Sequence, residues 1–444
     1  MDKKVIGSEP IYDARVLGAP RMLVLGFQHM FAMFGATVLV PTLTGLSVSA
    51  TLLFAGLGTL LFHLLAKGKV PAFLGSSFVF LAGYFAIAPN GERELLPYAC
   101  FGVMVAGLMY LILAAFFKVY GMKKVMRFFP PIVTGPIIIA IGLSLSGSAI
   151  TNCGANWGIA LVAIAIVIGF NMWGKGMMKI IPILLGVIGS YLVAAITGNV
   201  DFSAVKEAAW IGLPFQMQDT LFGLFAGEVN TGLLLTAVVT IAPLSLATMT
   251  EHIGDMCAIS STCDRNYMED PGFHRTLMGD GLATALAAVF GAPANTTYGE
   301  NTGVLALSKV YDPRVIRLAA IFAIVFSFCP KFAALISSMP TATIGGVSLV
   351  LYGMISAVGV RNIVENKVDF TNTRNVIIAA LILVLAIGVT YTGNIQIPLG
   401  GVTLTLTGLA VAAIVGIILN ALLPGKDYDF DQDHEGSTSV NFKV

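Results

Sequence analysis

Charge is what this sequence has least of. Only 11% of its 444 residues are Asp, Glu, Lys or Arg, whereas 57% are hydrophobic and the mean hydropathy is +0.87. A soluble globular domain carries about 25% charged residues, so this composition leaves too little polar surface for water. The formal net charge of +1 gives no reason to expect nucleic acid as a partner. The solvent that suits this composition is the lipid bilayer.

Cysteine is also scarce, and no signal peptide is predicted. The five cysteines lie at scattered positions: Cys100, Cys153, Cys257, Cys263 and Cys329. Their spacing matches neither a metal site nor a disulfide framework, so they are expected to be small buried hydrophobic residues. The first apolar run, from Met22, is too long for the hydrophobic part of a signal peptide. No cofactor and no metal are expected.

Apolar runs of spanning length, about 20 residues each, recur along the chain. We read fourteen of them, at 22–45, 50–66, 71–88, 97–118, 130–148, 157–173, 179–197, 231–255, 279–292, 300–311, 314–336, 341–359, 375–392 and 401–423. With the N-terminus inside, all but three of the 25 basic residues fall on the cytoplasmic face; the exceptions are Arg93, Lys206 and Lys331. This bias supports an even number of spans in the inner membrane, with both termini cytoplasmic.

Fourteen spans divide into two sevens joined by the long connection at 198–230. Because seven is odd, the two halves must have opposite orientations, which is the geometry of an inverted repeat. Weak sequence symmetry agrees with this division. Gln28-His29 in segment one corresponds to Glu251-His252 in segment eight, and Gly75 to Phe78 in segment three corresponds to Gly299 to Thr302 in segment ten.

Two glutamates lie in or beside these apolar segments. Glu251 belongs to the polar string at 250–255 and Glu300 to the string at 295–303. A carboxylate at membrane depth costs several kcal/mol unless it faces a cavity or a partner, so each acid marks a functional site. Segments three and ten are short and interrupted by Pro and Gly, which predicts half-helices that start near Ser77 and Glu300. Their N-termini would direct backbone N–H groups at a small polar solute.

Several longer strings point to a family. They are QHMFAMFGAT from Gln28, PAFLGSSF from Pro71, FPPIVTG from Phe129, EHIG from Glu251, NTTYGENTG from Asn295, and GGVSL from Gly345 leading to Tyr352-Gly353. In this order, and over nearly the whole chain, they resemble the bacterial uracil permeases. The signature of the wider nucleobase–ascorbate transporter family (nucleobase:cation symporter-2) corresponds to 300–303 followed by Ser308-Lys309, where Ser replaces the usual Thr.

The resemblance implies an all-α polytopic membrane protein with fourteen segments in a seven-plus-seven inverted repeat, and short strands in segments three and ten. It implies a core domain made of 17–128 and 231–338, and a gate domain made of 129–230 and 339–424. Residues 425–444 would form a cytoplasmic tail. A homodimer formed through the gate segments is also expected from the family.

The resemblance also implies roles for individual residues. The match of Glu251 would bind the pyrimidine ring, and that of Glu300 would fix the site and take part in proton coupling. Substrate-binding positions are expected at Glu251, Glu300, Phe78, Ser77, Gly299 and Tyr298. Proton-coupling positions are expected at Glu251, Glu300, Asp255, Tyr352 and His252.

Asp255 and His252 each keep two interpretations, whereas Asp280 has one. Asp255 stands where related uracil permeases can carry a histidine, one turn after Glu251, so it could join a carboxylate relay. The sequence favours the other interpretation, a solvated acid at the membrane edge, because 257–264 resembles a cytoplasmic loop. His252 is either a relay or a hydrogen-bonded core histidine. Asp280 is expected to cap the start of segment nine.

Together these features predict import of uracil, a nucleobase, by proton symport with alternating access of core and gate. A purine, xanthine or urate permease of the same fold is the alternative. An anion exchanger would need basic residues where this chain has acids. A membrane-embedded enzyme would need a nucleophile–base pair or a metal cluster, and no such motif is present.

Overall fold

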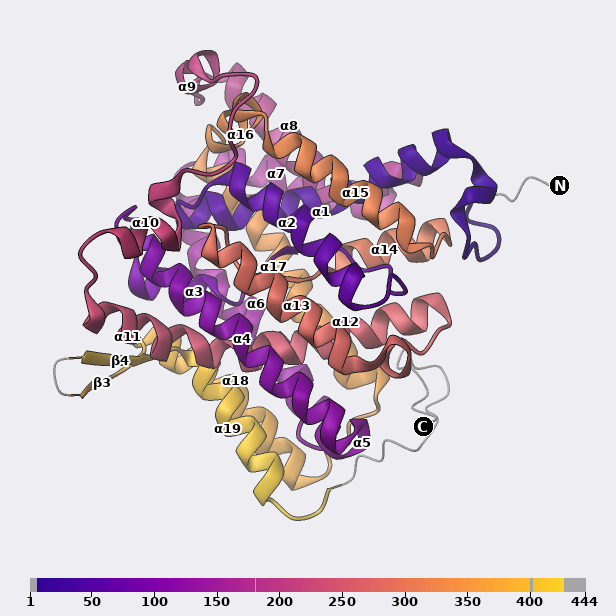
Figure 1. Ribbon diagram of the computed structural model, residues 1–444, viewed down its shortest axis with the longest axis vertical. Coiled ribbons are helices and arrows are strands. Elements are labelled where there is room, and N and C mark those ends of the chain that lie inside the picture. The colour runs from indigo at the N-terminus through magenta and orange to yellow at the C-terminus, as the bar shows by residue number, and fades with distance from the viewer. Residues whose placement is uncertain (1–5, 180, 400–401, 427–444) are drawn as a thin grey trace.

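Helices make up most of the computed structural model, which describes residues 6–179, 181–399 and 402–426 (Figure 1). The first half contains η1 (Ala14–Leu17), α1 (Ala19–Thr44), α2 (Val48–Leu65), β1 (Leu74–Ser76), α3 (Leu81–Ile87), α4 (Leu96–Tyr120), α5 (Met122–Met126), α6 (Pro131–Gly154), α7 (Trp157–Trp173), η2 (Gly176–Lys179) and α8 (Pro182–Ile196). The connection contains α9 (Ser203–Glu207), η3 (Met217–Asp219) and α10 (Leu221–Ala226). Most of the predicted tail, from residue 427 on, lies outside the described residues.

The second half opens, like the first, with two long helical segments, a short strand and a short helix. It contains α11 (Thr231–Ile241), η4 (Ala242–Leu244), α12 (Ser245–Cys263), η5 (Met268–Gly272), α13 (Phe273–Val289), β2 (Asn295–Thr297), α14 (Gly299–Ser308), α15 (Pro313–Ser327), α16 (Pro330–Ser337), α17 (Thr341–Glu365), α18 (Thr373–Tyr391), β3 (Ile395–Leu399), β4 (Val402–Leu406) and α19 (Gly408–Leu422). The predicted short strands of segments three and ten are therefore present as β1 and β2.

The described helices include seven that are long and apolar enough to span a membrane, or eight if α15 and α16, bent by 88°, form one span. Three shorter apolar helices, α7, α8 and α19, add to them. Each predicted apolar segment overlaps at least one of the described helices. The chain is thus a multi-pass membrane protein, and the number of fourteen spans stays a prediction.

Five predicted boundaries were wrong by six residues or more. Segment five ends at Gly154 and not at 148, and segment twelve ends at Glu365 and not at 359. Segment eight continues past residue 255, because α12 ends only at Cys263. Segment nine begins at Phe273 and not at 279. Segment fourteen begins at Gly408, because the preceding residues form an antiparallel hairpin in which Ile395 pairs with Leu406. This hairpin of β3 and β4 projects from the body of the molecule (Figure 1).

Helix contacts made by elements of one half are also made by the equivalent elements of the other half. α4 packs on α13 as α15 packs on α2, and α7 packs on α8 as α18 packs on α19. α6 packs on α17, its own counterpart, more extensively than any other helix pair. A Cβ added at Gly359 of α17 would lie 2.7 Å from the carbonyl oxygen of Gly135 in α6, so the two backbones are nearly in contact. This pairing supports the predicted repeat.

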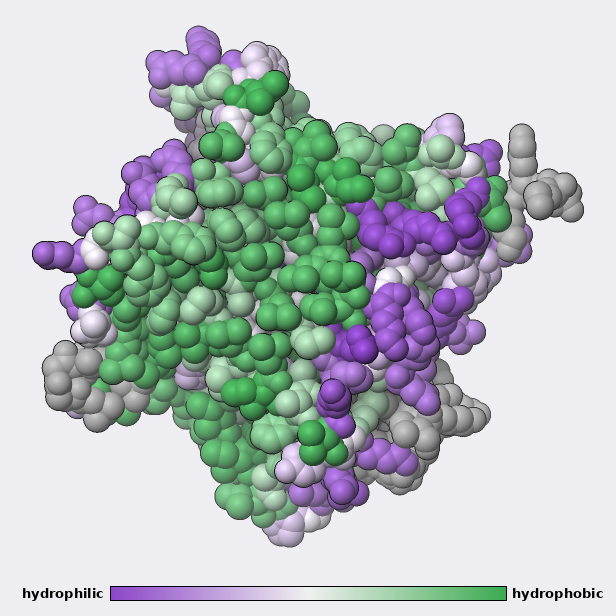
Figure 2. All heavy atoms as spheres, in the orientation of Figure 1, coloured by the Kyte–Doolittle hydropathy of each residue, from purple (hydrophilic) through white to green (hydrophobic). Residues whose placement is uncertain are grey.

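Hydrophobic side chains cover the middle of the face shown in Figure 2. Hydrophilic residues gather at its right edge, over the ends of α12 and α14, and at its upper left, over α9 and α10. Large apolar side chains such as Leu161, Trp173, Ile196 and Val384 are more than 40% exposed. A soluble protein does not expose such a broad apolar surface, so this middle zone fits the lipid interior.

Candidate functional site

The two broken segments meet in a short antiparallel sheet. Gly75 of β1 pairs with Thr296 of β2, between the pairs Leu74–Thr297 and Ser76–Asn295. One further bond extends the ladder at each end: Ser77 N donates to Ala294 O at 2.8 Å, and Tyr298 N donates to Phe73 O at 3.0 Å. These bonds satisfy backbone that would otherwise be costly at membrane depth.

This register corrects the sequence symmetry. The pairing is symmetric about the pair Gly75–Thr296, and the backbone N–H of Ser77 makes the same bond at one end as that of Tyr298 at the other. Ser77 therefore corresponds to Tyr298, and the next residues, Phe78 and Gly299, correspond to each other. The predicted match of Gly75 with Gly299 was therefore wrong by three residues. Gly75 is required for another reason, because a Cβ there would lie 2.5 Å from the ring of Tyr298.

The sheet adjoins a cavity of about 300 Å³. Glu251 and Asp255 of α12, Glu300 of α14, and the residues Phe78, Tyr298 and Gly299 all line it. The volume is at the lower end of the range of small-molecule sites. The cavity therefore gathers most of the predicted site residues, from segments that lie far apart in the sequence.

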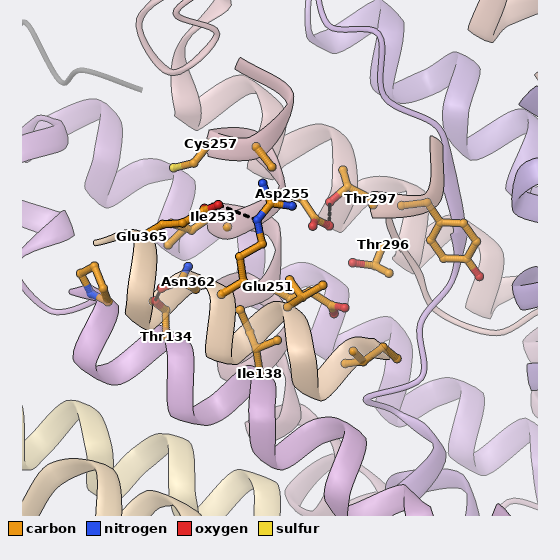
Figure 3. A pocket seen from close by; sticks show the side chains of 18 of the residues that line it. Thr134, Ile138, Glu251, Ile253, Asp255, Cys257, Thr296, Thr297, Asn362 and Glu365 are labelled. Carbon is orange, nitrogen blue, oxygen red and sulfur yellow. Dashed lines mark hydrogen bonds and ion pairs between the residues drawn. The ribbon is translucent and has the colours of Figure 1, made fainter. Parts of the chain in front are cut away.

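Asp255 belongs to this cavity, so its interpretation as a solvated acid at the membrane edge was wrong. Glu251 and Asp255 are four residues apart on α12 and lie on one face of it. Thr297 Oγ1 donates a hydrogen bond of 2.8 Å to Asp255 Oδ2 (Figure 3). Within the described part of the chain, Glu251 Oε2 has no hydrogen-bond partner. The cavity thus holds an acceptor that a ligand can satisfy.

The half-helices differ from their predicted positions. α14 begins at Gly299, one residue before the predicted start, so its N-terminal N–H groups lie at the cavity. Asn301 fixes this end by donating from Nδ2 to His29 O at 3.0 Å. α3 begins at Leu81, four residues later than the predicted start at Ser77. Only α14 therefore offers its N-terminus directly to the site.

Phe78 covers the cavity, with Tyr352 of α17 behind it. Their ring centroids are 5.7 Å apart in an edge-to-face arrangement, which is favourable for aromatic pairs. Phe78 lines the cavity, whereas Tyr352 is 1% exposed and is not part of the lining. Ser77 is fully buried and also lies outside the lining.

His252 faces away from the cavity, toward α13. Its Nδ1 lies 2.8 Å from Asp280 Oδ2, and its Nε2 lies 3.1 Å from Thr276 Oγ1. The Thr276 hydroxyl already donates to Phe273 O at 3.0 Å, so His252 Nε2 must be the donor to it. Both side chains of this contact are fully buried, where a polar group needs a polar partner.

Asp280 is therefore not the helix cap that was expected. It lies in the third turn of α13, whose N-cap is Gly272, and its side chain is fully buried. The pair of Asp280 and His252 joins α13 to α12. This contact fixes the rotation of α12 that turns Glu251 and Asp255 toward the cavity.

One wall of the cavity was missed by sequence reasoning. It is a stripe along α17 with helical spacing: Leu351, Ile355, Val358, Asn362 and Glu365. Counting forward by four and three residues from Leu351, next to the predicted Tyr352, would have found it. Arg361 also lines the cavity, and its Nε donates to Glu365 Oε1 at 2.6 Å. The stripe leads to the end of α17 that is predicted to be cytoplasmic.

The opposite wall comes from α6. Thr134 and Ile138 face the cavity from that helix (Figure 3), and Thr134 Oγ1 lies 3.4 Å from Asn362 Oδ1 on α17. The cavity is therefore enclosed by α12 and the strand pair on one side and by α6 and α17 on the other. No group of His, Cys, Asp and Glu among the described residues has the arrangement of a metal site.

Comparison with known proteins agrees with this architecture. The model of a permease family (Xan_ur_permease) matches residues 20–395. The uracil permease of Bacillus caldolyticus is 40% identical over 438 residues, which are 96% of each chain. The uracil permease of Escherichia coli K12 is 36% identical over 409 residues, which are 90% of each chain. A putative pyrimidine permease of the same strain, RutG, is 36% identical over 91% of this chain and 90% of its own.

Solved structures share the fold at lower identity. The transmembrane domain of the cyanobacterial bicarbonate transporter BicA has a TM-score of 0.56 and 16% identity, over 93% of this chain and 99% of that one. The murine anion transporter Slc26a9, in an inward-facing state, has a TM-score of 0.62 and 11% identity, over 95% and 69%. The matched family and its relatives are permeases and not enzymes. The chain belongs to this permease family, among the nucleobase–ascorbate transporters that include the bacterial uracil permeases.

Proposed function

We propose that this transporter imports uracil together with protons across the inner membrane. The observation that carries the proposal is the cavity in which Glu251, Asp255 and Glu300 lie beside the N-terminus of α14. Uracil offers two N–H donors and two carbonyl acceptors. Glutamate oxygens can accept from its N–H groups, and the backbone N–H groups of Gly299 and Glu300 can donate to a carbonyl.

The same carboxylates suit proton coupling. Three acids around one cavity repel one another when all are ionised, and a bound proton relieves that repulsion. Protonation of Glu251 or Glu300 would then favour closure around the loaded site. His252 and Tyr352 lie behind the cavity wall, so any part they take in coupling would be indirect.

Alternating access would use two groups of helices. The proposed core domain, 17–128 and 231–338, carries Glu251, Glu300 and Phe78. The proposed gate domain, 129–230 and 339–424, carries the walls on α6 and α17. The cavity extends to Arg361 and Glu365, at the predicted cytoplasmic end of α17. Rocking of core against gate would close this opening and open the other side. Cytoplasmic termini and a dimer through gate helices remain predictions.

The chemistry of the cavity disfavours an anion as substrate. BicA and Slc26a9 are anion transporters by name, but their likeness to this chain shows the fold alone. Arg361 is the single basic residue of the described lining, and it is paired with Glu365. An anion would face the three acids Glu251, Asp255 and Glu300, whereas a neutral nucleobase would donate hydrogen bonds to them.

Uptake of radiolabelled uracil into proteoliposomes tests the proposal. We expect accumulation that an inward proton gradient stimulates and a protonophore abolishes. Accumulation that ignores the gradient would refute proton symport and leave uracil transport standing. If excess xanthine competed fully with a weak uracil signal, the substrate would be a purine.

A further inference from the structure

The N-terminal residues 7–17, here called the strap, lie along the far ends of the two helices that carry the site carboxylates. The strap pairs with the chain just after α14: Ile11 N donates to Lys309 O at 2.8 Å, and Tyr311 N donates to Ile11 O at 2.8 Å. Gly7 N donates to Ser308 O at 2.9 Å. The end of α14 is therefore held by backbone bonds to a segment some 300 residues away in sequence.

Side chains strengthen this attachment. Ala14 N donates to the buried Asp312 Oδ2 at 2.7 Å, and Arg314 Nη1 donates to Asp13 Oδ1 at 2.9 Å. Hydrogen bonds from Arg15 hold the pKa of Asp13 well below its usual range, so Asp13 is a carboxylate at neutral pH. Beneath the polar contacts lies a buried apolar cluster of Ile11, Ala14, Leu17, Leu25, Val310 and Val315.

One strap residue, Tyr12, reaches across to α12. Its hydroxyl donates to the carbonyl oxygen of Cys263, the last residue of α12, at 2.9 Å. The Arg265 guanidinium lies 4.2 Å from the centroid of the Tyr12 ring, and the Tyr311 ring lies 5.5 Å away. Partial burial, and after it the charge of Asp264, raises the pKa of Tyr12, so the hydroxyl keeps its proton and remains a donor.

α12 and α14 have matching lengths between the site and the strap. Cys263 follows Asp255 on α12 by eight positions, and Ser308 follows Glu300 on α14 by eight positions, which is about 12 Å of helix in each case. At the site, Thr297 Oγ1 bonds to Asp255 and so links the start of α14 to α12. At the far end, Tyr12 and the strap link Cys263 to the chain after Ser308. The two helices are therefore joined at both ends.

We propose that the strap sets the spacing of α12 and α14, and that Tyr12 is a positioning residue for Glu251 and Glu300. The site needs both carboxylates at fixed distances from one small ligand, and the strap supplies backbone hydrogen bonds at the far end of α14. This inference rests on the proposed function, because it assigns the strap to the same uracil site.

The test compares Tyr12→Ala, Tyr12→Phe and the matched control Tyr120→Ala in the full-length reconstituted protein. Tyr120 is an exposed tyrosine at the end of α4. We expect Tyr12→Ala to raise the KM for labelled uracil about tenfold with little change in Vmax, from loss of one hydrogen bond and its ring contacts. Tyr12→Phe keeps the ring and should show a smaller rise, and Tyr120→Ala should match the wild type.

Amide hydrogen exchange gives a readout that does not depend on transport. We expect faster exchange in Tyr12→Ala at 259–265 and 305–312, and unchanged exchange there in the control. Faster exchange with a wild-type KM would overturn the positioning role, and unchanged exchange would overturn the strap itself. If the wild-type protein bound no uracil, the proposed function would fall, and exchange alone would then decide whether the strap joins the two helices.

Discussion

The two broken segments of this transporter share a backbone plan and differ in what they present to the cavity. Exchange of the strands places Phe78 where the other half has Gly299, and Val79 where it has Glu300. After β1, four residues precede α3, whereas after β2 only Tyr298 precedes α14. The first half thus contributes an aromatic ring, and the second contributes a helix N-terminus and a carboxylate.

This difference shows how a symmetric scaffold makes an asymmetric site. A small planar ligand needs hydrogen-bonding groups at its edge and an apolar surface at its face. Two identical halves would supply two charges or two rings. Here the paired strands have equivalent backbone geometry in both halves, and the residues that follow them, Phe78 in one half and Glu300 in the other, would divide the two tasks.

The largest expected effect is the loss of charge from the second half. Glu300→Gln and Glu251→Gln should each lower uracil uptake by about 100-fold or more, because each removes charge-assisted hydrogen bonds and a proton acceptor. Initial uptake rates in proteoliposomes of equal protein content measure the effect. The matched control is Glu92→Gln, because Glu92 lies outside the cavity and its carboxylate accepts hydrogen bonds from the nearby Asn90. Wild-type rates in either cavity variant would remove that residue from the mechanism.

Loss of the ring from the first half should rank second. Phe78→Ala removes a stacking surface worth about 1–3 kcal/mol for a nucleobase, which corresponds to a rise in uracil Kd of about 5- to 150-fold. Phe116→Ala, at an exposed phenylalanine of α4, serves as the control for the same change outside the site. Equilibrium binding of labelled uracil to purified protein measures both. An unchanged Kd in Phe78→Ala would mean that the ring does not touch the ligand.

Substitution of two glycines, Gly75 in the first half and Gly299 in the second, should affect the stability of the protein differently. Gly75→Ala should destabilise the protein by about 1–3 kcal/mol, because the added Cβ would overlap the Tyr298 ring and overpack the site. Gly299→Ala should change stability little, because the nearest atom to its added Cβ would be Asp255 Oδ1 at 3.9 Å. Thermal unfolding of both variants in the same detergent makes the comparison. Equal losses would contradict the register on which it rests.

The fold class and the carboxylates Glu251 and Glu300 could be predicted from the sequence, because each leaves a strong local signal in an apolar chain. The strands in the broken segments were expected only from the family resemblance. The position of Asp255 could not. Residues 257–263 look like a loop by polarity, yet they contain neither Gly nor Pro, and α12 continues until Asp264 ends it in a left-handed conformation. The absence of helix breakers was the better guide there.

Asp280 shows a different limit of the sequence. The string Gly279-Asp280-Gly281 suggested the start of a helix, because glycine is unfavourable inside one. In the structure these glycines lie inside α13 and allow close approach of Phe62 and Tyr110 from neighbouring helices. Glycine in a membrane helix marks packing as often as an end. Only the partner helices, which sequence periodicity does not identify, decide between the two.

The smallest expected effect separates two hydroxyls at equivalent strand positions, Ser76 and Thr297. Thr297 Oγ1 donates to Asp255, whereas Ser76 Oγ donates to the backbone carbonyl of Thr37 at 2.9 Å. Thr297→Val should therefore raise the KM for uracil about 2- to 10-fold, the value of one hydrogen bond that orients a site carboxylate. Ser76→Ala should leave KM unchanged and cost about 1 kcal/mol of stability. Measurements of KM and thermal unfolding for both variants test this division of tasks. If Ser76→Ala changed KM as much as Thr297→Val, the two halves would share the binding chemistry. The asymmetry seen at Phe78 and Glu300 would then not extend to the strands.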